Sequence, residues 1–379
     1  MERQIKVLAV GDPAVEAYVN PKYSLVERIN RNFSCRISFH IIPWDQYYGK
    51  MMEAFALDEF DIVMVAGHLW LKDFVKKEFL AKVEYPDTKD FDQEDILETI
   101  HNEMKVDNSY YLYPSFCDGH ILLYRKSIVN KVIGDVLPEV VDTDTVISLA
   151  EKCDGMRGLC LKAHQSEIFT DFLPYLRNEG IDAYDINGVP TFNNEKGINS
   201  LYKYLSLKKW APKHTFRYGN EEVRQAFQQK DVVLATTWGG QLGTVLDKRC
   251  LELDDVGFSA LKTSWNVTWS FGINNLSKNK ELSNEILSYL SSKEIDRIIG
   301  GIAGSPVRKS TYLVDSAKYN WYKIHLCLIE KYAKPLPMIN NSGEKQAYIY
   351  EHLYNVFVGK ETPEKALESA ENSMLGLRN

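Results

Sequence analysis

The chain has 379 residues, of which 45% are hydrophobic and 26% are charged, and its formal net charge is −7. The composition is ordinary for a globular protein, and the length is enough for two domains with sizeable cores. The excess of acidic residues disfavours nucleic acid as a partner. No apolar run approaches the ~20 residues that a membrane-spanning helix needs.

The cysteines and histidines give no sign of a metal site. The six cysteines are scattered without a Cys-x-x-Cys spacing, and the eight histidines are dispersed. Cys153 and Cys160 could bridge a short loop, but free buried thiols are the expected state. Neither a metal nor a cofactor is expected.

The first part of the chain alternates strands and helices. Apolar runs predict strands at residues 5–10, 36–42 and 61–66, and helical spacing of apolar residues predicts helices at 23–33, through 52–56 and at 74–80. This order predicts a parallel sheet with right-handed crossovers, in which ligands sit beyond the carboxyl ends of the strands. The residues that follow these ends are candidate ligand contacts: Asp12, Trp44, Asp45, Gly67 and His68.

Residues 112–124 combine two patterns. The first half contains aromatic residues, Pro114 and Asp118, and predicts extended chain or a strand edge, because proline lacks a backbone donor. The second half, 121–124, is a short apolar run typical of a buried strand. An acid between aromatic residues is well placed to hold a polar ligand with flat apolar faces, so Phe116 and Asp118 are candidates. The alternative is an ordinary strand with a solvated Asp118.

A second α/β region follows. Helices are predicted at 143–152, 168–178, 194–207, 223–228, 281–290, near 318–333, at 345–357 and from 362, and strands at 158–161, 231–236, 256–258 and 270–273. An irregular loop is expected at 263–269 and a glycine-rich turn at 300–305. Residues that follow strands or lie in the loop complete the candidate set: Gln165, Glu167, Trp238, Gly239, Trp265 and Trp269.

Several blocks, in order over nearly the whole chain, resemble one family. Residues 271–280 match a G-I-x-x-x-S-K-N-K pattern closely, and 305–310 resemble x-P-V-R-K-S. Residues 289–294 resemble F-L-x-S-x-E. Two blocks carry a substitution: D-I-V … G-x-L-x-x-L at 61–81 has Glu78 for the glycine, and hydrophobic-Y-N-K at 123–126 has Arg125 for the asparagine. Two more lack one residue of the pattern: T-W-x-E-L from 142 lacks its tryptophan, and A-F-x-x-G-K-x-A-M at 226–234 lacks its glycine. The family is the extracellular solute-binding proteins of ABC importers, in the group that includes the maltose-binding protein.

The resemblance implies a two-lobe periplasmic-binding-protein fold, with a mostly parallel sheet and flanking helices in each lobe and a ligand cleft between them. The N-terminal lobe would comprise residues 1–117 and 262–308, and the C-terminal lobe 118–261 and 309–379. It also implies that the protein is a monomer that captures a carbohydrate, such as an oligosaccharide, for ABC permease subunits in the membrane. An upstream signal segment and an extracytoplasmic location, with or without a lipid anchor, are expected for the same reason.

Sugar binding needs aromatic faces for the C–H patches of the ring, and carboxylates, amides or guanidinium groups for the hydroxyls. Asp118 would lie at the cleft floor, and Trp238 would stack on the ligand, since Gly239 and Gly240 leave its ring little steric cover. Replacing either residue should then leave folding intact. The structural alternatives are a core tryptophan at 238, a helix cap at Asp45 and a satisfied polar residue at His68. Arg308 is expected to be structural.

Other functions stay open at this stage. No G-x-S-x-G, G-x-G-x-x-G, P-loop or H-E-x-x-H motif occurs, so an enzyme is not expected. Asp45 and Asp118 could imitate the carboxylate pair of a glycosidase. A polyamine, phosphate-ester or iron binder of the same fold is also possible, because iron binders of this shape usually present paired tyrosines, as at Tyr47-Tyr48 and Tyr110-Tyr111.

Overall fold

The computed structural model describes residues 3–155 and 158–377 and divides into two compact α/β units. Unit 1 comprises Met1–Asp118 and Val267–Lys323, and unit 2 comprises Gly119–Asn266 and Ile324–Asn379. The chain therefore crosses between units after residues 118, 266 and 323, whereas the sequence suggested crossings after 117, 261 and 308. None of the described helices combines the length and apolar character needed to cross a membrane.

The sheet of unit 1 is built around β1 (Arg3–Val10), which pairs in parallel with β2 (Cys35–Ile42) and β3 (Ile62–Ala66). This confirms the predicted parallel order. β11 (Asn266–Ile273) pairs antiparallel with β3, so that Trp269 lies opposite Ala66 at the carboxyl end of β3. Every residue of β3 is buried, as expected of a strand covered on both faces.

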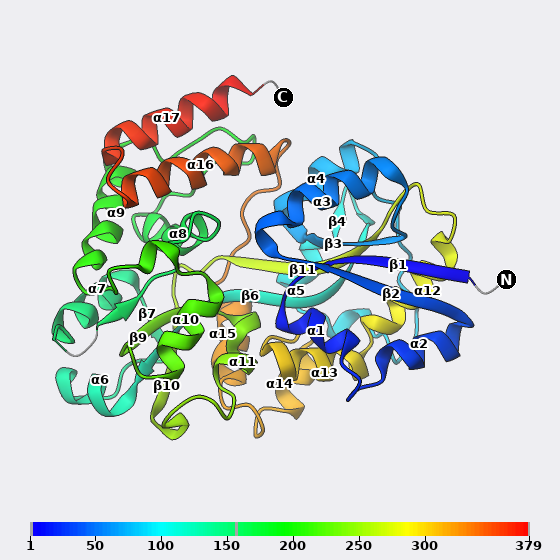
Figure 1. Cartoon of the computed structure of the whole chain (residues 1–379), viewed down its shortest axis with the longest axis horizontal. Helices are drawn as coiled ribbons and strands as arrows, with labels where there is room; N and C mark the ends of the chain where they lie inside the picture. Colours follow the sequence, from blue (N-terminus) through cyan, green and yellow to red (C-terminus); the bar gives the residue numbers. More distant parts are fainter. Residues whose placement is uncertain (1–2, 156–157, 378–379) are drawn as a thin grey trace. The chain divides into compact units, whose positions relative to one another are not determined.

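Helices cover both faces of this sheet (Figure 1). One face carries α3 (Trp44–Leu57) and α4 (Gly67–Lys76). The other carries α1 (Pro13–Val19), α2 (Leu25–Phe33), α12 (Lys280–Leu290) and α13 (Lys293–Ala303). Unit 1 also contains α5 (Glu98–Glu103), α14 (Lys309–Val314) and a ribbon of β4 (Lys105–Val106) and β5 (Ser109–Tyr110).

In unit 2, β6 (Leu112–Arg125), which begins in unit 1, pairs antiparallel with β9 (Leu234–Trp238) and β10 (Val256–Leu261). β8 (Leu159–Cys160) and β7 (Val140–Val141) add parallel outer strands. The helices are α6 (Lys126–Ile133), α7 (Thr143–Lys152), α8 (Ile168–Asn178), α9 (Glu195–Ser206), α10 (Asn220–Gln228), α11 (Leu242–Val245), α16 (Ser342–Phe357) and α17 (Pro363–Gly376). α15 (Tyr322–Lys331) begins in unit 1 and continues into unit 2.

Several sequence expectations about local structure were wrong. The helix predicted at 74–80 begins at Gly67, directly after β3, and ends at Lys76. Gly300 and Gly301 lie inside α13 rather than in a turn, because the missing side chain of Gly300 leaves room for Pro306, whose Cβ would be 2.5 Å from an added Cβ. Residues 266–269 belong to β11 rather than to a loop, and the strand predicted at 231–236 spans 234–238. Pro114 lies inside the fully buried β6, not at a loose edge.

The positions where the chain departs from the family pattern have clear structural counterparts. Glu78 and Lys230 have φ of +55° and +64°, in the left-handed region that favours glycine. Arg125 is buried, and its guanidinium donates to the carbonyls of Phe227, Leu251 and Glu252, where it closes the end of α10. All six cysteines are free thiols, so the expected state is confirmed.

Candidate ligand-binding site

Three tryptophans form a cluster in unit 1, which we call the tryptophan triad. Trp44 is the first residue of α3, Trp70 lies on α4 and Trp269 lies on β11. The centroids of the Trp44 and Trp70 rings are 6.3 Å apart with an interplanar angle of 23°, and Trp269 contacts both edge-on, at 5.7 and 5.9 Å. Trp44 is half-buried and the other two are buried. The triad therefore places an indole that is partly open to solvent just beyond the carboxyl end of β2.

Two further candidates lie on β6 beside the triad. Phe116 is fully buried and stacks on Trp269, with ring centroids 6.4 Å apart and an interplanar angle of 17°. Asp118, the last residue of this part of unit 1, is 6% exposed. The solvated carboxylate of the structural alternative is therefore not observed, because Asp118 is buried.

Gly67 and His68 are explained by Glu103 of α5. The Nδ1 atom of His68 lies 2.6 Å from Oε2 of Glu103, and both side chains are buried. Thr268 donates to the same carboxylate from its backbone N–H at 3.1 Å and from its hydroxyl at 2.8 Å. A Cβ at Gly67 would lie 2.9 Å from Oε2 of Glu103. These contacts give Gly67 and His68 a structural role in anchoring α4 to α5 and β11.

The two aspartates near strand ends serve helix N-termini in different ways. Asp12 caps α1, and its Oδ1 accepts the N–H of Ala14 at 2.9 Å. Asp45 is exposed in the first turn of α3, where a negative charge is favoured by the helix dipole, but the cap position is Pro43. The structural alternative for Asp45, a helix cap, is therefore not observed.

Trp238 is the centre of a second aromatic cluster, in unit 2. Its Nε1–H donates to Oε2 of Glu167 at 3.3 Å, and Nζ of Lys162 lies 3.7 Å from its ring centroid. The rings of His120 and Trp265 meet the indole edge-on, at 4.5 and 5.6 Å. The expected lack of steric cover was therefore wrong: Trp238 is 5% exposed, and its removal would leave a cavity that costs stability.

Two candidates next to this cluster differ in their surroundings. Gly239 is required by packing, since a Cβ there would lie 2.0 Å from Nε2 of His325. Gln165 is exposed on the segment between β8 and α8. Of the candidates in unit 2, Glu167, Trp238 and Trp265 are thus brought together, Gly239 supports them, and Gln165 stands apart.

Around Trp238, one cation, Lys162, faces two carboxylates, Glu167 and Asp171. The ammonium of Lys162 faces the carboxylate of Glu167 through the indole, and the backbone N–H of Lys162 donates to Asp171 at 3.2 Å. Burial raises the pKa of Asp171, while Lys162 opposes that rise. Burial, followed by the charge of Lys162, holds the pKa of His120 well below its usual range, so this imidazole is neutral. Such an environment disfavours an anion.

Sequence reasoning missed four residues of these clusters. Trp70 lay between the strand predicted at 61–66 and the helix predicted at 74–80, although its position soon after a strand, like that of Trp44, was a usable signal. Glu103, His120 and Lys162 carry no local signal, because their roles depend on partners that are distant in the chain.

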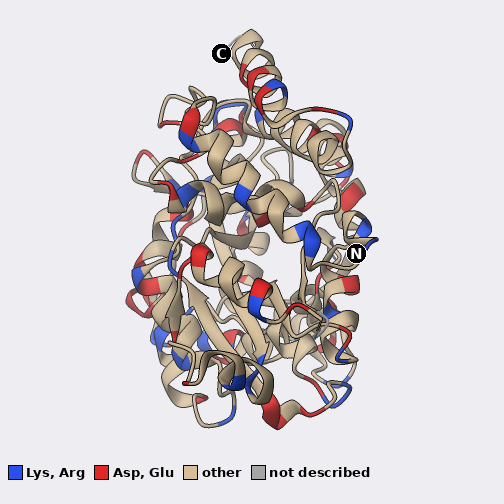
Figure 2. Cartoon of the chain, turned by 90° about the vertical axis from the view of Figure 1, so that its left-hand side faces the viewer, with Lys and Arg blue, Asp and Glu red and all other residues tan. Residues whose placement is uncertain are grey.

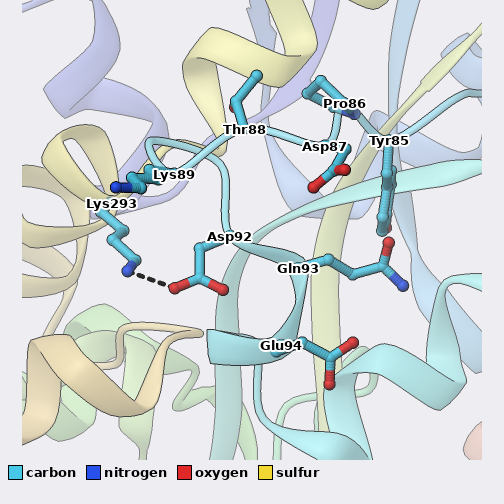
Figure 3. Close-up of a pocket in the computed structure, with 9 residues that line it drawn as sticks. All are labelled: Tyr85, Pro86, Asp87, Thr88, Lys89, Asp92, Gln93, Glu94 and Lys293. Atoms are coloured by element: carbon cyan, nitrogen blue, oxygen red, sulfur yellow. Dashed lines mark hydrogen bonds and ion pairs between the residues drawn. The ribbon is translucent and has the colours of Figure 1, made fainter.

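A separate pocket of about 560 Å³ lies in unit 1, and none of the candidate residues lines it (Figure 3). Its walls are formed by Tyr85, Pro86, Asp87, Thr88, Lys89, Asp92, Gln93, Glu94 and Lys293. Arg308, structural as expected, donates to the carbonyl of Asp92 and so fixes this loop. Within residues 3–155 and 158–377, no group of histidine, cysteine and carboxylate side chains is arranged to hold a metal ion.

Comparison with solved structures shows the same fold in proteins of low sequence identity. Maltose-bound MalE3 of T. maritima superposes with a TM-score of 0.86 over 98% of this chain and 99% of that one, at 20% identity. An ABC transporter solute-binding protein of Agrobacterium vitis with bound D-mannitol gives 0.83 at 19% identity, covering 98% and 97%. The GacH receptor of Streptomyces glaucescens, solved with acarbose, gives 0.81 at 20% identity over the whole of both chains.

Sequence comparison leads to the same family. A "probable amino-acid ABC transporter periplasmic-binding protein" of Sinorhizobium fredii is 24% identical over 276 residues, which are 69% of this chain and 63% of that protein. The match thus spans less than two thirds of that relative's length. The family model described as "Bacterial extracellular solute-binding protein" matches residues 25–323. The chain belongs to the bacterial extracellular solute-binding protein family, which is one of binding proteins rather than enzymes.

Proposed function

We propose that the protein is the substrate-binding component of an ABC transporter and that its solute is an uncharged carbohydrate or polyol. The observation that carries this proposal is the pair of aromatic clusters, one in each unit, the second of which is hydrogen-bonded to the carboxylate of Glu167. Indole faces suit the C–H patches of a sugar ring, and carboxylates accept its hydroxyls. The sugars and polyols held by MalE3, the A. vitis protein and GacH support the same ligand class.

We further propose that units 1 and 2 are the two lobes of the family fold and that each contributes ligand contacts. Unit 1 would offer Trp44, with Asp118 and Trp269 behind it. Unit 2 would offer Glu167, with Trp238 and Trp265.

Charge argues against an anionic ligand and against iron. A phosphate ester needs an excess of cationic donors, whereas around Trp238 one cation, Lys162, faces two carboxylates, Glu167 and Asp171. On the face shown in Figure 2, acidic and basic residues are interspersed along the helices and loops. Iron would need ionised tyrosines, yet burial raises the pKa of Tyr47 and that of Tyr110, and the Tyr47 hydroxyl donates to the carbonyl of Met64.

A thermal-shift screen tests the proposal, because a ligand stabilises the folded state by mass action. The arms are neutral oligosaccharides, polyols, sugar phosphates, polyamines and amino acids, the last because of the Sinorhizobium fredii relative. We expect a rise in melting temperature with neutral sugars or polyols only, followed by unchanged ligand on chromatography after incubation. A rise confined to amino acids or to charged solutes would overturn the proposed ligand class, and hydrolysis of the sugar would show an enzyme.

Location and partners follow from the same proposal. We propose that the protein is a monomer outside the cytoplasmic membrane, either periplasmic or held by a lipid anchor, and that it delivers the solute to membrane permease subunits. Its membership of an extracellular family supports this placement.

A further inference from the structure

We propose that His120 is a positioning residue that orients the indoles of Trp238 and Trp265 for the ligand; this inference rests on the proposed function. His120 is fully buried on β6, directly opposite Trp238 on β9, so the two residues are cross-strand neighbours. It contacts three separate segments of unit 2: β9, helix α8 and the segment that precedes β11.

The contact with α8 begins with a proline. Pro174 lies inside α8, and because it has no N–H, the carbonyl of Thr170 four residues earlier lacks its normal helical donor. Nε2 of His120 lies 2.9 Å from that carbonyl oxygen. A carbonyl only accepts, so Nε2 must carry the proton. The helix defect created by Pro174 thus selects one tautomer of His120.

The selected tautomer leaves Nδ1 as an acceptor, and the backbone N–H of Trp265 donates to it at 3.2 Å. The same segment is held a second time, because the backbone N–H of His120 donates to Oγ of Ser264 at 2.8 Å, and that hydroxyl donates to the carbonyl of Trp265 at 2.8 Å. With its ring edge-on to Trp238, His120 therefore fixes the backbone of one tryptophan and the ring of the other.

Two substitutions separate the hydrogen bonds of His120. In His120→Asn, the side-chain oxygen can replace Nδ1 as the acceptor for Trp265, but the amide does not reach Thr170. In His120→Gln, the amide N–H can replace Nε2 as the donor to Thr170, but the acceptor that Nδ1 offered to the N–H of Trp265 is lost. Both variants lose the ring that packs on Trp238, so their losses of stability should be similar.

The test combines a measurement without ligand and one with ligand. The protein, with its seven tryptophans labelled as 5-fluorotryptophan, gives fluorine resonances that single Trp→Phe substitutions assign. Because the His120 ring contacts both indoles, we expect both variants to move the signals of Trp238 and Trp265, and His120→Gln, which also loses the acceptor for the Trp265 N–H, to move that of Trp265 farther than His120→Asn does. By calorimetric titration with the best sugar of the screen, His120→Gln should bind about tenfold more weakly or worse, and His120→Asn should stay closer to wild type.

Two outcomes would overturn the inference. One is a Trp265 signal that His120→Gln moves no farther than His120→Asn does. The other is an equal loss of affinity in both variants that follows their loss of stability, which would leave His120 a purely structural residue. If the wild type binds no sugar at all, the proposed function fails, and the fluorine signals still decide whether His120 positions the two indoles. Pro174→Ala supplies an independent check: with a new N–H competing for Thr170, it should move the Trp265 signal in the direction seen in His120→Gln.

Discussion

The imidazole of His325 fills the space that a side chain at position 239 would need. An added Cβ at Gly239 would lie 2.0 Å from Nε2 of His325 and 2.8 Å from Cδ2 and Cε1. His325 is fully buried, and burial lowers its pKa to about 3, so it is a neutral packing group. Packing against α15 thus leaves no room for a side chain after Trp238.

Gly239→Ala should therefore destabilise the protein. Overpacking of a buried site typically costs about 1–3 kcal/mol, and we expect a loss of that size in the free energy of unfolding measured with urea. Gly49→Ala is the matched control, because Gly49 lies in α3 with nothing within 4 Å of the added Cβ. The control should gain up to ~1 kcal/mol from the entropy of the unfolded chain. Equal stability of the two variants would contradict the packing role of His325.

Asp296 should make folding stability fall as the pH rises. It is fully buried, and burial raises its pKa to about 6, although Arg308 and two hydrogen bonds oppose the rise. The pKa of this carboxyl is 3.8 in the unfolded chain and about 6 in the folded one, so between these pH values the folded state binds more protons than the unfolded state. The contribution of Asp296 to the free energy of unfolding is therefore fully present below pH 3.8 and is lost as the pH rises through about 6. The difference amounts to about 3 kcal/mol.

Asp296→Asn should remove this pH dependence, because an amide accepts from Val307 and donates to Thr311 without titrating. Urea unfolding at several pH values measures it. Asp142→Asn is a control of opposite sign: hydrogen bonds from Thr145 lower the pKa of Asp142, so its contribution to stability is lost as the pH falls. If the difference in the free energy of unfolding between the wild type and Asp296→Asn stays constant from pH 4 to 7, the buried carboxyl does not titrate in this range.

Lys230→Gly should stabilise the protein. Lys230 has φ of +64°, which costs a residue with a Cβ roughly 1 kcal/mol, and glycine relieves this strain against a smaller entropic loss. Lys230→Ala is the control, since it also removes the ion pair with Glu252 but keeps the Cβ. We expect the glycine variant to melt above the alanine variant. If alanine is equal or better, the strain at this position is negligible.

Trp44→Ala should weaken sugar binding more than it weakens the fold, because Trp44 is the half-buried member of the tryptophan triad. An interface tryptophan that acts as a hot spot contributes about 2 kcal/mol or more, and calorimetric titration would measure this loss. Trp210→Ala is the comparison, since Trp210 lies outside both aromatic clusters. The affinity of this variant for the sugar should match that of the wild type. Unchanged affinity of Trp44→Ala would remove the triad from the proposed site.

The sequence by itself determined the alternation of strands and helices, the parallel order of β1, β2 and β3 and the family, because these depend on local periodicity and on blocks of adjacent residues. Helix α8 was predicted at its observed bounds, 168–178, although the purpose of Pro174 within it was invisible. The helix start at Gly67 was missed because glycine is a poor local signal for a helix. The space that a side chain at position 67 would need is occupied by the carboxylate of Glu103, which is distant in the sequence.

Only the tertiary structure decided what the candidate residues touch. The partners of His68, Trp238 and Trp265 lie 35, 71 and 145 positions away in the chain, at Glu103, Glu167 and His120. The periodicity of the sequence does not predict such pairings. They arise because buried polar groups must find hydrogen-bond partners among the segments that packing brings together. Packing likewise leaves no room for a side chain at Gly67 or Gly239. The hydrogen bonds of His120, which no motif marks, reach both α8 and the backbone of Trp265.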